Sequence, residues 1–320
     1  MKRRVRAMGA LLAAAVLAST QAGAADWPAK PIFIVVPFAT GGAADTFARL
    51  IADPLAKELK QTVVVENRGG AGGLLGSAQV ARANADGYTL LLGGLAPQVI
   101  APAINPNSGY DPIRDFTQIA YLGGPPICWV VTPSTDMYSL DDVLNRARAG
   151  SLSGYASSGI GTLGHLVTEF VIQKTGIRLA HIPYNTAALG DIIAGHVTLG
   201  SFTWGAVMGQ VQGGALRPIA LTTENRLPGF PKLQTFKELG YDLVASTWFS
   251  LSGPAGLPGE ITRQLNTAVN KILQMPDIRR RLEQDAIEPK SMSPDELTKF
   301  VEQEIARWKP IAVSAGVKSR

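Results

Sequence analysis

The chain has 320 residues, of which 46% are hydrophobic, a formal net charge of +5 and one cysteine, Cys128. Four of its basic residues and none of its acids lie within residues 1–24, so the remaining chain has a net charge of +1. This nearly neutral net charge lacks the excess of basic residues that is typical of nucleic-acid-binding proteins. A single cysteine excludes an intramolecular disulfide. We therefore expect a packed core, and the length suits two lobes.

Residues 1–24 have the pattern of a cleavable export signal. Basic residues at positions 2–6 precede an apolar run over 8–17, and Ala22-Gly23-Ala24 is the small-residue motif that signal peptidase recognises. The apolar run is too short to span a bilayer. The sequence thus predicts secretion with cleavage after Ala24.

The first half of the chain alternates strands with helices. A continuous apolar run typical of a buried parallel strand is followed by a helix that contains Pro54, which we expect to kink or break it. This alternation predicts a βαβαβ unit with a parallel sheet. In chain order, we expect a strand at 32–38, a helix at 47–59, a strand at 62–66, a helix at 74–83 and a strand at 88–92.

A second α/β series begins near residue 127, and two helices close the chain. The first closing helix has an apolar stripe over 261–273, and the second begins with a capping box at Ser293. Two such series predict two lobes with a cleft between them. We expect helices at 139–149, 164–175 and 189–194, and strands at 153–156, 179–182, 197–202, 217–221 and 247–252.

Two loops, over 37–45 and 155–162, each lead from a predicted strand into a helix N-terminus. Their small residues allow a ligand to approach the backbone closely. The helix that follows offers the free N–H groups and the positive dipole end of its N-terminus. A pair of such loops, one in each lobe, suits a clamp for an anion. Asp45 fits a helix cap better than a ligand group, because its carboxylate would repel the anion.

Other chemistries fit less well. Residues 159–164 match the GxGxxG pattern, but no acid ends the next strand, as a dinucleotide site requires. Ser157 and Ser158 lack the glycines of a nucleophile elbow, and the three histidines lack metal-site spacing. We expect no catalytic residue, no metal and no cofactor. His165 could bond either a ligand or local backbone, and an exported hydrolase or transferase that uses Ser157 or Ser158 with His165 is the enzyme alternative.

The order and spacing of several motifs resemble the Bug family of periplasmic binding proteins, which serve tripartite tricarboxylate transporters. The motifs are VPFATGGAADTFARL (36–50), VVVENRGGAGGLLG (63–76), ADGYTLLLG (85–93), YASSGIGTLGHL (155–166), HIPYN (181–185) and WFSLSGPAGLP (248–258).

The resemblance implies an α/β fold of the type II periplasmic binding class, with one lobe from 25–124 and 245–320 and the other from 125–244. It implies a periplasmic monomer that captures a small carboxylate by cleft closure and delivers it to integral membrane transporter subunits. A binding protein that feeds a membrane signalling receptor is the alternative.

By position, the resemblance also implies the ligand-facing residues. In the first lobe they are Phe38, Ala39, Thr40, Gly41, Gly42, Ala43 and Asp45; in the second they are Ser157, Ser158, Gly159, Gly161 and Thr162, with Asn185 and Thr186 after them. Where family members often carry an acid, this chain has Ser201 to Trp204, which argues against an amino-acid ligand. Leu95, Phe38 and Trp204 are instead expected to pack an apolar part of the ligand.

Overall fold

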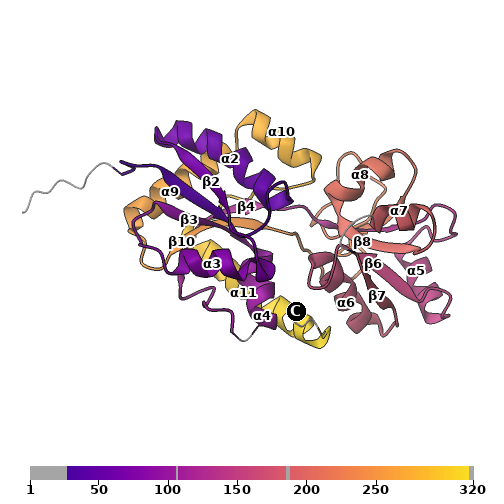
Figure 1. Cartoon of the computed structure of the whole chain (residues 1–320). Coiled ribbons are helices and arrows are strands. Elements are labelled where there is room, and N and C mark those ends of the chain that lie inside the picture. The colour runs from indigo at the N-terminus through magenta and orange to yellow at the C-terminus, as the bar shows by residue number, and fades with distance from the viewer. Residues whose placement is uncertain (1–26, 106, 185–187, 317–320) are drawn as a thin grey trace, which may run out of the picture.

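The computed structural model describes residues 27–105, 107–184 and 188–316, and these form two α/β lobes (Figure 1). Each lobe is built on a five-stranded sheet, with strand order β2-β1-β3-β10-β4 in the first lobe and β7-β6-β8-β5-β9 in the second. The sequence prediction of two α/β lobes is therefore confirmed. The predicted export signal lies outside the described residues. Within those residues, no helix has the length and apolar character needed to cross a membrane.

The first lobe contains the predicted βαβαβ unit. Strands β1, β2 and β3 pair in parallel, and β10 joins β3 and β4 antiparallel to both. Pro54 lies inside α2 without ending it, so the predicted break is wrong. The elements are β1 (Ile32–Val36), α2 (Ala43–Leu59), β2 (Val63–Asn67), η2 (Ala71–Gly73), α3 (Leu74–Ala81), β3 (Thr89–Gly94), η3 (Ala96–Ile100), α4 (Ala101–Ile104), β4 (Phe116–Gly123), β10 (Phe249–Pro254), α9 (Gly259–Ile272), α10 (Pro276–Gln284) and α11 (Pro294–Ser314).

The second lobe repeats the same architecture. Strand β6 pairs in parallel with β7 and β8, and β5 runs antiparallel between β8 and β9. The elements are β5 (Ile127–Val131), α5 (Leu140–Arg148), β6 (Gly154–Ser157), α6 (Leu163–Thr175), β7 (Ala180–Pro183), α7 (Ala188–Ile193), β8 (Leu199–Thr203), α8 (Trp204–Gln212) and β9 (Arg217–Leu221).

Two short connectors join the lobes. One runs from β4 to β5, and the other leads into β10, where Pro126 and Ser246 form a β-bridge. The connectors touch at Gly124, because a Cβ there would lie only 2.0 Å from the carbonyl oxygen of Thr247. Since β4 ends and β5 begins at the first connector, the strand directions place the carboxyl ends of β1, β3, β6 and β8 at the sheet edges that face the other lobe.

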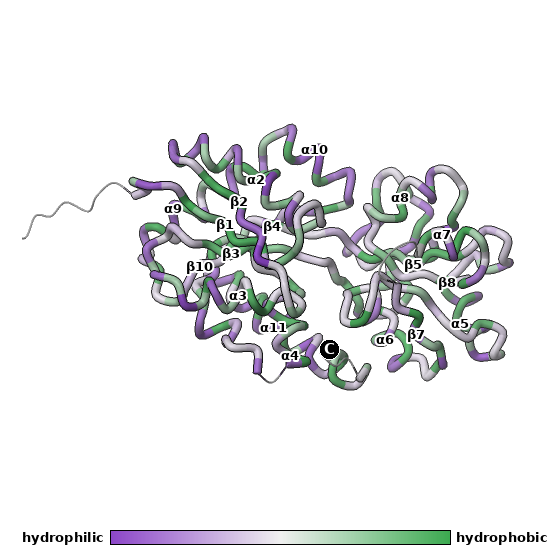
Figure 2. Tube along the Cα trace, in the orientation of Figure 1, coloured by the Kyte–Doolittle hydropathy of each residue, from purple (hydrophilic) through white to green (hydrophobic). Residues whose placement is uncertain are grey.

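Hydrophobic residues concentrate along the strands and on the inward faces of the helices (Figure 2). One core lies between the first sheet and helices α2 and α9. A second core joins Trp308 of α11 to both lobes. Near the same helix, Gln173 Nε2 of α6 donates to Ser314 Oγ at 2.7 Å, and an Arg307 guanidinium nitrogen donates to the Val244 carbonyl at 2.6 Å. Helix α11 therefore ties the second lobe to the first.

Candidate functional site

The loop of the first lobe runs from the end of β1 to the start of α2. Residues 39–43 are exposed and Phe38 is half-buried. Gly42 is the N-cap of α2, and no side chain among the described residues caps this helix. The first N–H groups of a helix have no intrahelical partner, so the loop presents open donors at the edge that faces the second lobe.

Asp45 shapes this loop. Its buried carboxylate accepts the Gly41 N–H at 2.9 Å and pairs with the Arg49 guanidinium at 3.0 Å. The hydrogen bond from Arg49, followed by that from Gly41, lowers the pKa of Asp45 to about 2. Asn67 Nδ2 in turn donates to the Phe38 carbonyl at 3.2 Å. Asp45 is thus not the predicted N-cap: it lies in the first turn of α2 and reaches back to Gly41, while Arg49 balances its charge.

The loop of the second lobe runs from the end of β6 to the start of α6. Gly159 and Gly161 have φ values of 130° and 76°, which favour glycine. The hydroxyl of Thr162, the N-cap of α6, donates back to the Gly159 carbonyl at 2.8 Å, so in the described part of the chain no side chain caps α6. Ser158 is exposed. This loop therefore also offers open N–H groups and a hydroxyl.

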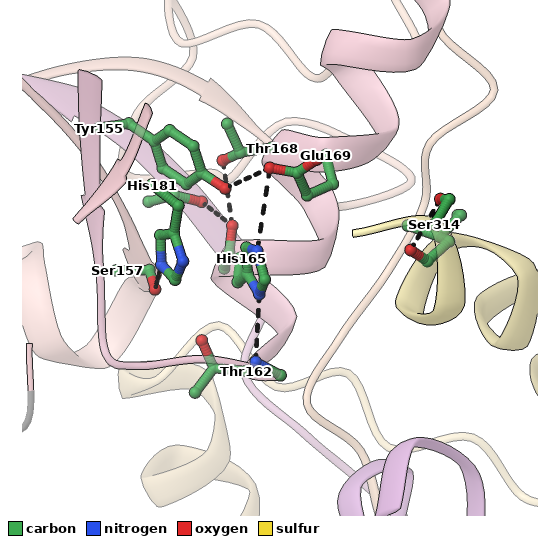
Figure 3. Close-up of polar contacts among 12 residues, drawn as sticks. Tyr155, Ser157, Thr162, His165, Thr168, Glu169, His181 and Ser314 are labelled. Atoms are coloured by element: carbon green, nitrogen blue, oxygen red, sulfur yellow. Dashed lines mark hydrogen bonds and ion pairs between the residues drawn. The ribbon is translucent and has the colours of Figure 1, made fainter. Parts of the chain in front are cut away.

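A cluster of histidines packs against the inner side of the second loop (Figure 3). Ser157 is buried, accepts the Gly159 N–H at 3.1 Å, and lies 2.7 Å from His181 Nε2. The rings of His181 and His165 stack with centroids 3.9 Å apart and 8° between their planes. His165 Nδ1 accepts the Gly161 N–H at 3.1 Å. The Ser157 hydroxyl is thus engaged inside the lobe.

The two imidazoles of this cluster are neutral at neutral pH. Burial lowers the pKa of His165 to about 4, with the neighbouring His181 adding to the effect, and burial lowers the pKa of His181 to about 4 as well. Glu169 accepts the Tyr155 hydroxyl at 2.9 Å. Burial, reinforced by this carboxylate, raises the pKa of Tyr155. At neutral pH the two histidines therefore bring no positive charge to the second loop.

The helix starts at the facing edges differ from those elsewhere. In the described residues, no side chain caps α2, α3, α6 or α8 at these edges. The first turns of α3, α6 and α8 carry no acid, whereas that of α2 carries Asp45, whose charge Arg49 balances. Helices α5 and α11 instead have complete capping boxes, at Ser139 and Ser293. Helices α9 and α10, although uncapped, carry Glu260 and Asp277 in their first turns. The facing edges therefore keep helix N-termini open for an external anion.

A cavity of about 750 Å³ lies beside the connectors. Its walls include Trp204 and Phe230 of the second lobe and Trp248 of the first. Among the described residues that we expect to contact a ligand, Trp204 alone lines this cavity. Trp204 packs edge-to-face on Phe230, and both Trp204 and Leu95 are only 2% exposed. Leu95 is buried in the first lobe, whereas Trp204 also lines this cavity, so the expectation that these side chains pack an apolar part of the ligand stays a prediction.

The structure thus brings the predicted residues of each loop to an edge that faces the other lobe, while Asn185 and Thr186 lie outside the described residues. The sequence prediction missed Arg49, Asn67 and His181. The four-residue spacing of Asp45 and Arg49, typical of a helical ion pair, could have identified Arg49. Among the described residues, no group of three or more His, Cys, Asp or Glu is placed to hold a metal ion.

Comparison with known proteins places this geometry in a family. Residues 47–317 match the tripartite tricarboxylate transporter family receptor. The chain is 34% identical over 324 residues to Protein BugT of Bordetella pertussis, with 99% of each chain covered. The structure of an R. palustris protein with adipate is 34% identical, with a TM-score of 0.78, over 92% of this chain and 99% of that one. The structure of MatC from Rhodopseudomonas palustris with bound malate is 28% identical, with a TM-score of 0.74, over 89% and 100% of the two chains. The chain therefore belongs to the tripartite tricarboxylate transporter receptor family.

Proposed function

We propose that this protein is a periplasmic solute-binding protein that closes its two lobes on a small carboxylate and delivers it to the membrane subunits of a tripartite tricarboxylate-type transporter. The single observation that carries the proposal is the pair of loops at facing edges, each leading into an uncapped helix. Family membership supports it, as do the similar structures with adipate and with malate.

The proposed mechanism follows from the division of the site between the lobes. Each loop offers only part of the donor set, so the ligand gains its full set of hydrogen bonds when the lobes meet. A ligand that binds the closed form better shifts the equilibrium towards it. Each hydrogen bond to a charged carboxylate is worth about 1.5–3 kcal/mol. The closed form is then the species that the transporter recognises.

Calorimetric titration of the mature protein with malate, adipate, longer dicarboxylates and amino acids tests this proposal. We expect saturable binding of at least one carboxylate and weaker or no binding of amino acids. Absence of binding by every carboxylate, in protein that unfolds cooperatively, would contradict the proposed ligand class. Co-purification with transporter membrane subunits, compared with a signalling receptor, tests the proposed partner separately.

One contact favours an enzyme as the second candidate: Ser157 Oγ lies 2.7 Å from His181 Nε2, the geometry of a nucleophile with its base. Two observations weigh against it. Ser157 is fully buried, and within the described residues no carboxylate is hydrogen-bonded to His181 to orient the ring. We therefore propose that the protein is not an enzyme. Turnover of a carboxylate ester that Ser157→Ala abolishes would support the enzyme instead.

A further inference from the structure

His165 lies against the inner side of the second loop, at the start of α6. Its side chain is 4% exposed, and its Nδ1 accepts the Gly161 N–H at 3.1 Å (Figure 3). This bond joins the end of the loop to the helix, because Gly161 precedes α6 and His165 lies in its first turn. His165 Nδ1 is thus the hydrogen-bond partner of the Gly161 N–H, and the contact orients that peptide group.

The hydrogen bond specifies the tautomer of His165. Because Nδ1 accepts a hydrogen bond from the Gly161 N–H, it carries no proton itself, so the ring proton of the neutral imidazole is on Nε2. Nε2 faces Glu169 Oε1 across 3.8 Å. On the flat side of the ring, His181 stacks at 3.9 Å. The ring is therefore held in its plane by a stacked partner and in its tautomer by two polar neighbours.

We propose that His165 is a positioning residue for the ligand: its neutral Nδ1 holds the Gly161 peptide in the orientation in which the second loop binds the carboxylate. This proposal rests on the proposed function. His165 need not touch the ligand, because it acts through the Gly161 backbone. Protonation of Nδ1 would place two N–H groups against each other and release the loop.

Burial, more than any charged neighbour, keeps the His165 ring neutral. The titratable groups that face it are Glu169 on α6, His181 on β7 and Tyr155 on β6. The Glu169 carboxylate, which also accepts the Tyr155 hydroxyl, favours a charged ring, whereas a charge on His181 would oppose a charge on His165. Burial is the main cause that lowers the pKa of His165 to about 4. The ring therefore keeps its acceptor over the whole neutral range.

Three substitutions test the proposal, with the affinity of the carboxylate that binds the wild type as readout. His165→Ala removes the acceptor, and we expect about a tenfold loss of affinity. His165→Asn places an amide oxygen near the position of Nδ1, so we expect affinity within about threefold of wild type. His196→Asn is the matched control, because the His196 side chain is 73% exposed, and we expect no change.

Two further measurements separate positioning from general damage to the fold. In His165→Ala, amide hydrogen exchange should accelerate in the peptide that covers 157–163, while α9 and α11 keep wild-type protection. The wild-type affinity, divided by that of His165→Asn to cancel titration of the ligand, should stay constant from pH 8 to 6 and fall about twofold near pH 4.

Equal affinity of His165→Ala and wild type would overturn the proposal, as would failure of Asn to restore what Ala loses. A wild-type affinity that rises relative to His165→Asn at acid pH would also overturn it, because a protonated ring would then attract the anion. If the wild type binds no carboxylate at all, the proposed function fails first.

Discussion

The close approach of α6 to β8 gives a quantitative prediction for Gly164. A Cβ at this position would lie 2.2 Å from the Ser201 carbonyl oxygen, whereas real Cβ contacts under 3.0 Å are essentially never seen. Helix and strand would therefore have to separate by about 0.8 Å. We expect Gly164→Ala to lower the free energy of unfolding by about 1–3 kcal/mol, the usual cost of overpacking. Urea and thermal unfolding measure this loss directly.

Gly209 in α8 is the matched control for this substitution. It is also a helical glycine, but a Cβ there would have no neighbour within 4 Å among the described atoms. Gly209→Ala should therefore raise the free energy of unfolding by about 0.5–1 kcal/mol, because alanine has the higher helix propensity. The two substitutions should have opposite signs. A Gly164→Ala protein as stable as Gly209→Ala would refute the packing argument.

Three further predictions concern charge and capping. Asp45→Asn should weaken carboxylate binding severalfold in calorimetry, because the loop loses its ion pair with Arg49; stronger binding would mean that the Asp45 charge repels the ligand. The free energy of unfolding should fall as the pH drops from 6.5 towards 4. The reason is that the folded protein holds His165 and His181 neutral, with pKa values near 4, while histidines of the unfolded chain protonate near pH 6.5. Urea unfolding at both pH values measures this loss, which should be smaller in a double His165→Asn, His181→Asn protein. Ser293→Ala should cost about 1 kcal/mol in urea unfolding through loss of the α11 capping box and leave ligand affinity unchanged, whereas a change in affinity would indicate that α11 influences the site.

Much of the fold could be predicted because local patterns and tertiary structure agree. The buried runs of β1 and β3 and the alternation of strands with helices predicted the parallel sheet, and the capping box at Ser293 marked the start of α11. The sequence prediction missed α8, α10 and the π-helix η3. Pro97 lies inside η3 and Pro276 begins α10. Proline usually indicates a loop, but these two prolines lie within helices.

The loops could be predicted, but the residues that hold them could not. Their small residues and following helices are visible in the sequence. The contacts of Asn67 with Phe38 and of His181 with Ser157 join positions 29 and 24 residues apart. Such contacts arise only when neighbouring parallel strands pair, so no local periodicity reports them. The contact of the Trp204 ring with Phe230 could likewise not be predicted, because only tertiary packing brings the two rings together.

The central claim, that a carboxylate binds at the N-terminus of α2, is tested most directly at Ala43. This exposed residue is the first of the helix. An aspartate there favours the helix by about 0.3–1 kcal/mol and places a negative charge where we expect the ligand. The measurement is the carboxylate affinity of Ala43→Asp, with Ala43→Asn as the uncharged control. We expect Ala43→Asp to remain folded and lose at least about tenfold in affinity, while Ala43→Asn loses far less. Wild-type affinity in a folded Ala43→Asp protein would contradict the claim.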